Sequence, residues 1–275
     1  MKKSLIWAFL VSVLMLAGCD ENTSPPAADT TPHDPVPADI FPLLKGHQYE
    51  FGGYLTSGSS ETKIPGSESL SATWTILGDT ALTSVFPGPM VSHLSVTSAA
   101  LIFDQLTVPG IQSAKTTPVF IYRDQTNGDY YYLTNFGNFF RTYAIYAAGT
   151  EKIRGDSLRF IKLSTGSAKL NTPYTVFLET FQSNYFGPTA IALKLEIIGN
   201  YEQKTGLTLN VNGKDTTITS YYLTVTNSAA LGTISPQKSI NAKFWLAPGI
   251  GPVQFFLAGD SEAPGSFRKL TKKNF

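Results

Sequence analysis

Few side chains in this 275-residue sequence are of types that perform chemistry. Cys19 is the only cysteine, so its thiol can form no disulfide within the chain and cannot belong to a cysteine-rich metal site. Three histidines, at positions 33, 47 and 93, leave little for a metal site built from imidazoles. His47 and His93 could each serve as a base beside a hydroxyl nucleophile, but the sequence has no Gly-x-Ser-x-Gly motif to supply one. The most specific chemistry that remains is alkylation of one thiol.

The residues before Cys19 have the organisation of a secretory signal. A short cationic start precedes an apolar run of 13 residues, shorter than the ~20 residues that a transmembrane helix needs. The run ends in Leu16-Ala17-Gly18-Cys19, which resembles the cleavage box of bacterial lipoproteins. The resemblance implies cleavage by signal peptidase II and transfer of a diacylglyceryl group to the Cys19 sulfur. Residues 1–18 are therefore predicted to be a signal peptide, and membrane lipid is the predicted partner of Cys19.

The same resemblance implies a lipid-anchored protein of the bacterial cell envelope. Mature lipoproteins carry several acyl chains, which hold a protein stably at a bilayer where a single chain does not. The membrane itself stays open, because Asp20 resembles an inner-membrane retention signal of enterobacteria, whereas the pair Asp20-Glu21 resembles a surface-export signal of other lineages. Of these locations, the outer membrane or the cell surface is favoured over the inner membrane.

Composition restricts the function classes and marks a tether. The formal net charge is +1 and charged residues make up 15% of the chain, which argues against a nucleic-acid-binding protein. Residues 20–39 hold five prolines and no large aromatic residue. Such a segment cannot bury enough apolar surface to offset the entropy lost on ordering. Residues 19–39 are therefore predicted to be the lipidated cysteine and a disordered, proline-rich tether.

Beyond the tether, apolar and polar residues alternate with a period of two, which is typical of half-buried β-strands. The alternation is clear at 70–76, 191–197 and 240–246. In the last of these runs it places Ile240 on the same apolar face as Phe244. Each run is therefore predicted to be an antiparallel strand with one buried face.

Two Asn-Gly pairs, Asn127-Gly128 and Asn212-Gly213, lie between strand-like runs and favour two-residue type I′ hairpin turns. At the first pair, such a turn would place Tyr122 opposite Leu133. No convincing long amphipathic helix is evident. Residues 40–275 are therefore predicted to form one mainly β, antiparallel domain, a strongly curved sheet or open barrel, with a β-sandwich as the alternative.

Two phrases near the ends of this domain carry a family resemblance. FPLLKG begins at residue 41, and FWLAPGIGPV begins at residue 244. Together they resemble the opening and closing phrases of a family of uncharacterised bacterial envelope lipoproteins, although His47 and Tyr49 stand where that family tends to have Asn and Trp. The resemblance implies a half-open or closed antiparallel barrel and no established activity. On its own residues, the second phrase is predicted to be a hairpin with a glycine-rich turn, because Pro248 cannot donate to a β-ladder.

Acidic residues offer a further chemistry, since two carboxylates that flank a bound sugar can hydrolyse it. Glu179 and Glu196 lie in strand-like runs, where solvent-facing positions are the simpler interpretation. His47-x-x-Glu50 is not the helical paired-histidine motif of zinc proteases, and no calcium-loop spacing is convincing. The sequence thus predicts no catalytic residue, no metal and no cofactor, and it favours a protein that is not an enzyme.

Aromatic residues point to binding instead. Eight of them crowd seventeen positions: Tyr130, Tyr131, Tyr132, Phe136, Phe139, Phe140, Tyr143 and Tyr146. Most are expected in the core, where aromatic side chains bury the largest areas, but one strand face could line a groove. Tyr130 and Tyr132, which share a face in a strand, and Trp245 are the predicted groove residues.

These observations leave three functional hypotheses. The first is a membrane-anchored envelope lipoprotein whose β domain binds or scaffolds without catalysis. The second is a carrier that holds a lipid or other amphiphile inside a curved sheet, and an apolar pocket of ~300–1,000 Å³ would favour it. The third is an envelope glycan hydrolase, which two carboxylates ~5–9.5 Å apart in a cleft would favour. The corresponding partners are a small amphiphile, a glycan or an envelope protein.

Overall fold

The computed structural model describes residues 34–58, 60–68, 70–80, 91–97, 116–135, 158–183, 191–231, 237–259 and 264–275. Within these ranges the chain forms twelve β-strands and no α-helix, and hence no helix that could span a membrane. The strands are β1 (Gln48–Thr56), β2 (Leu70–Thr80), β3 (Val91–Thr97), β4 (Thr116–Arg123), β5 (Tyr130–Asn135), β6 (Leu158–Ser164), β7 (Tyr174–Ser183), β8 (Ile191–Val211), β9 (Lys214–Leu231), β10 (Gln237–Ala247), β11 (Gly251–Leu257) and β12 (Gly265–Lys273).

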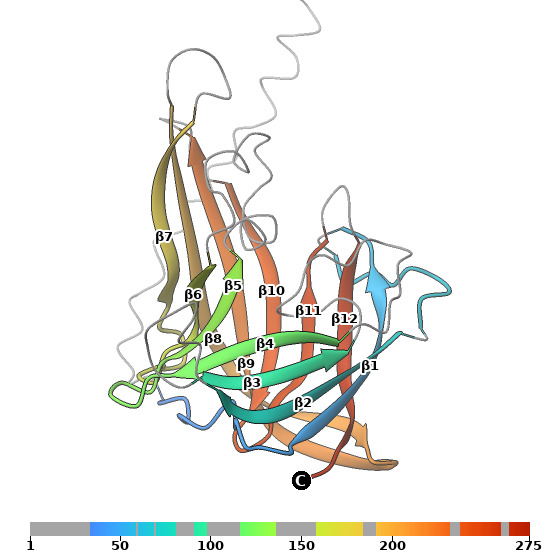
Figure 1. Ribbon diagram of the computed structural model, residues 1–275. Helices are drawn as coiled ribbons and strands as arrows, with labels where there is room; N and C mark the ends of the chain where they lie inside the picture. Colours follow the sequence, from blue (N-terminus) through green and yellow to red (C-terminus); the bar gives the residue numbers. More distant parts are fainter. Residues whose placement is uncertain are drawn as a thin grey trace, which may run out of the picture. The chain divides into compact units, whose positions relative to one another are not determined.

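All twelve strands belong to one sheet, in the order β6-β5-β4-β3-β2-β1-β12-β11-β10-β9-β8-β7. Each half of the sheet is a meander of six consecutive strands, and the antiparallel pairing of β1 with β12 joins the two halves in the middle. Figure 1 shows β2, β3 and β4 side by side and directed across β9 and β10. The single antiparallel sheet confirms the predicted fold class, and the described strands do not divide into the two sheets of a sandwich.

The sheet curves so far that its two edges come together. Ser164 at the end of β6 and Tyr201 in β8 share a hydrogen bond of 2.7 Å between their hydroxyls. The hydroxyl of Tyr174, on β7, donates to the main-chain carbonyl of Leu163 at 2.9 Å. Among the described residues no β-ladder joins β6 to β7. The sheet is therefore an open barrel whose edges are connected by side chains.

Removing the Tyr201 hydroxyl is expected to weaken this connection. Tyr201 and Ser164 are 0% and 3% exposed, so Tyr201→Phe leaves the Ser164 hydroxyl buried without its partner. We expect a loss of about 1–2 kcal/mol of unfolding free energy, measured by urea denaturation. Combining Tyr201→Phe with Ser164→Ala should cost less than the sum of the single changes, because both partners are then absent. Strict additivity would show that the hydroxyls do not interact.

Aromatic residues from strands distant in the sequence fill the interior of the barrel. Phe51, Trp74 and Phe255 are each 0% exposed. The ring centroid of Phe51 lies 4.8 Å from that of Trp74 and 5.4 Å from that of Phe255. The apolar face predicted at 70–76 is confirmed, because its four residues Leu70, Ala72, Trp74 and Ile76 are all buried.

The face predicted at 240–246 is wrong at one position. Ala242, Phe244 and Leu246 are buried as predicted, but Ile240 is 43% exposed. The register of β10 against β9 shifts between Ile240 and Ala242, which marks a β-bulge. One extra residue in a strand moves the residues before it to the opposite face, so the bulge places Ile240 outside.

The Asn212-Gly213 pair forms the predicted two-residue turn. The two residues have φ angles of 56° and 77°, and the flanking residues Val211 and Lys214 pair with each other. These positive φ angles are the ones that a type I′ turn requires.

The prediction for Asn127-Gly128 is wrong. Tyr122 pairs with Tyr131 rather than with Leu133, so the loop between β4 and β5 is longer than two residues. The N–H of Asp124 donates to the carbonyl of Asp129 at 2.8 Å and closes the longer loop. Within the loop, the carboxylate of Asp124 accepts a hydrogen bond from the N–H of Thr126 at 2.8 Å in an Asx turn.

The packed domain begins before residue 40, where its start was predicted. Val36 is buried, and its N–H donates to the carbonyl of Ala168 at 2.9 Å. The N–H of Leu170 donates to the carbonyl of Asp34 at 3.0 Å. Residues 34–41, here called the strap, therefore pack against the domain, and the predicted tether extends too far at 39. The proline-rich composition gave no sign of the buried Val36 side chain or of the backbone hydrogen bonds that residues 34–39 make.

Candidate functional site

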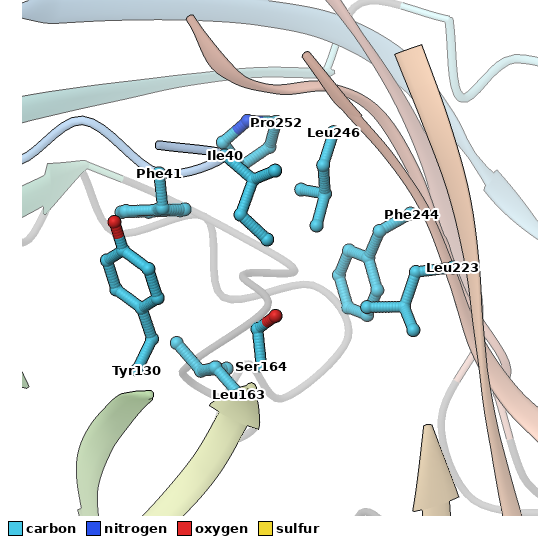
Figure 2. Close-up of a pocket in the computed structure, with 9 residues that line it drawn as sticks. All are labelled: Ile40, Phe41, Tyr130, Leu163, Ser164, Leu223, Phe244, Leu246 and Pro252. Atoms are coloured by element: carbon cyan, nitrogen blue, oxygen red, sulfur yellow. The ribbon is translucent and has the colours of Figure 1, made fainter. Parts of the chain in front are cut away.

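A small cavity lies where the strap meets the barrel interior (Figure 2). The strap contributes Ile40 and Phe41, and the segment of the second phrase contributes Phe244, Leu246 and Pro252. The remaining lining residues are Tyr130, Leu163, Ser164 and Leu223. Figure 2 shows Phe41 and Tyr130 on one side of the cavity, with Leu223, Phe244 and Leu246 on the other. The two phrases quoted for the family resemblance thus meet at this cavity.

Backbone and side-chain contacts seat the strap. The N–H of Gly249 donates to the carbonyl of Asp39 at 3.0 Å, and the hydroxyl of Tyr130 donates to the carbonyl of Ala38 at 3.0 Å. The rings of Phe41 and Tyr130 meet edge to face, with centroids 6.4 Å apart. Ile40 and Phe41 are only 2% and 7% exposed, so they are part of the core rather than a surface cover.

The second phrase is the predicted glycine-rich hairpin. It joins β10 to β11, and the N–H of Ile250 donates to the carbonyl of Ala247 at 3.0 Å across the turn. Gly249 and Gly251 have φ angles of 68° and 99°, which favour glycine over residues with a Cβ. This turn is what brings the Gly249 N–H to the strap.

The cavity is apolar and small. Its two side-chain hydroxyls are already engaged, that of Ser164 with Tyr201 and that of Tyr130 with the carbonyl of Ala38. Its volume is about 40 Å³, which holds a few water molecules. A pocket for a larger ligand needs ~300 Å³ or more. This cavity is therefore too small to be a preformed site for an acyl chain.

The predicted groove residues do not form one groove. Tyr130 lines the cavity and Tyr132 is buried in the core at 4% exposure. Trp245 points to the other face of β10 from the lining residue Phe244, because neighbouring residues in a strand face opposite sides. There it packs against Tyr222, with ring centroids 4.8 Å apart. The structure thus brings one of the three predicted residues to the cavity.

The acidic pair considered for glycan hydrolysis does not converge. Glu179 lies opposite Leu195 across the β7–β8 ladder, whereas Glu196 lies opposite Leu178. Residues directly opposite each other share a face, and consecutive residues in a strand do not. The two carboxylates therefore point to opposite faces of the sheet, and this pair cannot flank one substrate.

His47 packs as an aromatic ring. It stacks on Phe275 with ring centroids 3.8 Å apart and an interplanar angle of 3°. Burial and the nearby ammonium of Lys273 lower the pKa of His47 below its usual value, which favours the neutral imidazole. Among the described residues, its Nδ1 has no hydrogen-bond partner and no cluster of metal ligands occurs. The His93 backbone lies in β3, but its side chain falls outside the part that the structure describes.

A buried carboxylate that the sequence did not indicate holds two loops together. Asp129 is 5% exposed and pairs with Lys162, with 2.6 Å between Oδ2 and Nζ. Its Oδ1 accepts hydrogen bonds from the N–H of Gly166 at 3.0 Å and the hydroxyl of Thr165 at 2.9 Å. Tyr131 donates to Oδ2 at 3.2 Å. Both oxygens of the Asp129 carboxylate have partners within the protein, so this arrangement indicates a structural role.

The electrostatics of Asp129 agree with this role. Burial alone would raise the pKa of its carboxyl, but the Lys162 ammonium, the Gly166 N–H and the Thr165 hydroxyl together lower that pKa below its usual value. The pKa of Lys162 is raised although burial opposes this, because Asp129 stabilises the ammonium. Both directions favour the ionised pair. Only its place beside the predicted Asn127-Gly128 turn could have drawn attention to Asp129 in the sequence.

Other predicted residues lie outside the described part of the chain. These are the box residues Leu16, Ala17 and Gly18 with Cys19, and the aromatic residues Phe136, Phe139, Phe140, Tyr143 and Tyr146. Their chemistry stays a prediction from the sequence.

No protein-family model and no curated protein sequence matches this chain significantly. A solved structure of a predicted lipoprotein from Parabacteroides distasonis matches it with a TM-score of 0.44 and 9% identity, over 87% of this chain and 100% of that one. A predicted exported protein from Bacteroides fragilis, described as having a YmcC-like fold, matches with a TM-score of 0.38 and 9% identity, over 86% of this chain and 98% of that one. Both TM-scores lie below 0.5, so no function is transferred from either protein to this chain.

Proposed function

We propose that this chain is a lipid-anchored protein of the bacterial cell envelope whose β domain binds or scaffolds. The anchor rests on the sequence Leu16-Ala17-Gly18-Cys19. The role of the domain rests on one observation, which is that the strap fills the barrel interior beside the cavity with Ile40 and Phe41. A domain whose own chain occupies its interior presents its surface, rather than a pocket, to other molecules.

For a carried ligand to occupy this cavity, the strap would have to leave. The described cavity of about 40 Å³ is roughly an order of magnitude below the volume that a larger ligand needs. Withdrawing Ile40 and Phe41 would break the contacts of two nearly fully buried apolar side chains and the hydrogen bonds to Ala38 and Asp39. We therefore expect the domain purified from its native host to hold no lipid apart from the acyl chains on Cys19.

Metabolic labelling with palmitate tests the anchor. We expect label in the wild-type chain and its complete loss in Cys19→Ser, because the sequence holds no other thiol. A control that combines Cys19→Ser with Ser24→Cys restores a thiol outside the box and should also stay unlabelled. Label in either variant would overturn the anchor. Native mass spectrometry of the chain purified from its native host tests the second half of the proposal, since a stoichiometric lipid beyond the acyl chains on Cys19 would support a carrier instead.

A further inference from the structure

Four large apolar side chains in the described part of the chain are more than 40% exposed, and two of them lie at one place. Leu44 is 60% exposed and Leu77 is 45% exposed. The N–H of Gly46 donates to the carbonyl of Ile76 at 2.8 Å, which brings the turn after the strap against β2 beside both leucines. Isolated exposed leucines are ordinary on protein surfaces, but two that flank one backbone contact form a patch.

A β-bulge in β2 exposes Leu77 of this patch. The register of β2 against β3 shifts between Ile76 and Gly78, so Leu77 occupies a β-bulge. Ile76 is 1% exposed and fills the core, while Leu77 points to solvent. Gly78 has a φ of 110°, and a Cβ there would lie 3.2 Å from Cδ of Lys45. Because Gly78 has no side chain, the aliphatic part of the Lys45 side chain can lie against β2 at this position.

We propose that Leu44, Lys45 and Leu77, together called the membrane patch, contact the surface of the bilayer that holds the acyl chains of Cys19. This inference rests on the proposed function, because the bilayer is within reach only if Cys19 is lipidated. Asp34, the first residue of the strap, lies fifteen residues after Cys19, which limits the span between them to roughly 50 Å. Leu44 follows ten residues later, directly after the strap.

The chemistry of the patch fits a lipid surface better than a protein partner. Leucine side chains can enter the boundary between head groups and acyl chains, and a lysine stem can lie there while its ammonium reaches a phosphate. The side-chain amide of Asn274 donates to the carbonyl of Gly46 at 3.0 Å, and the neighbouring Lys273 ammonium acts on His47, so the C-terminal residues place a further cation near this turn. A stable protein interface needs roughly 1,000 Å² or more, far beyond three side chains. A weak membrane contact suffices here, because the anchor makes it an intramolecular event.

Fluorescence quenching in reconstituted vesicles tests the proposal. The full chain is first shown to be palmitate-labelled at Cys19, then carries a second cysteine, Leu44→Cys or Leu77→Cys, labelled with an environment-sensitive fluorophore. The matched control is Leu178→Cys, since Leu178 is 52% exposed and lies on β7 at the edge of the sheet. Vesicles of phosphatidylethanolamine and phosphatidylglycerol contain a lipid with a nitroxide near its head group.

We expect the fluorophores at 44 and 77 to shift their emission to shorter wavelength and to be quenched by the nitroxide lipid, and the fluorophore at 178 to do neither. Equal quenching at all three positions would show contact without a preferred face and would overturn the membrane patch. Absence of quenching at 44 and 77 in palmitate-labelled protein would overturn it as well, while leaving the lipid anchor intact. Absence of palmitate would instead overturn the proposed function itself.

Discussion

Gly53→Ala is expected to destabilise the domain by about 3 kcal/mol or more, the upper range for overpacking a tightly packed site. A Cβ at position 53 would lie 1.9 Å from the carbonyl oxygen of Phe267 and 3.0 Å from Cα of Arg268. Both atoms belong to the backbone of β12, so no side-chain rotation can relieve the clash. Strand β1 would have to move away from β12, and this ladder joins the two halves of the sheet. Urea or thermal unfolding measures the loss.

The neighbouring Gly52 supplies a matched control. A Cβ at position 52 would meet only the Cγ2 atom of Thr271 at 3.1 Å, and that methyl group can shift by a few tenths of an ångström. Gly52→Ala should therefore cost much less than Gly53→Ala, although both changes add one methyl group to the same strand. Equal unfolding midpoints for the two variants would show that β1 and β12 can separate locally without cost. The β1–β12 ladder would then not be essential for holding the two halves of the sheet together.

Asp129→Asn is expected to destabilise the domain by about 3 kcal/mol at neutral pH. The amide keeps the shape of the side chain but removes the charge opposite Lys162, and its NH₂ group cannot accept the hydrogen bonds that an oxygen accepts now. Denaturant unfolding measures the loss. The control is Asp215→Asn, because Asp215 accepts one exposed hydrogen bond from Asn210 and should change stability by less than about 0.5 kcal/mol.

The stability difference between wild type and Asp129→Asn is expected to depend on pH. The pKa of Asp129 is lower in the folded than in the unfolded chain, so the unfolded state takes up the proton first as the pH falls. The contribution of Asp129 is therefore present above about pH 4 and is lost as the pH falls through the pKa of the folded protein. Wild type and Asp129→Asn should converge in unfolding free energy under acidic conditions. A constant difference between them down to low pH would show that the charge of Asp129 is not what stabilises the loops.

Local patterns were sufficient where neighbouring residues decide the structure. The burial of Trp74 with its alternate neighbours and the turn at Asn212-Gly213 depend on residues within a few positions of one another, and both were predicted correctly. Ile240 shows the limit of such patterns, because a single bulged residue reverses the facing of a strand and leaves the composition unchanged. The loop after Tyr122 shows the same limit. It is longer than two residues, and its Asp129 accepts a hydrogen bond from the N–H of Gly166 in another loop, a contact that no pattern near Asn127-Gly128 encodes.

The sequence established the mainly β class, the single antiparallel domain and the absence of a basic, nucleic-acid-binding composition, and it located the thiol on which the proposed lipid anchor depends. These follow from composition and from spacing along the chain. The folded chain alone revealed that the strap enters the core, that the two phrases meet at a small cavity, and that Trp245 and Tyr130 lie apart. The first two bring together segments far apart in the sequence, which no short-range pattern encodes because the residues involved meet only when the sheet curves. The third needed the structure as well, because only the folded chain shows which face of β10 lines the cavity.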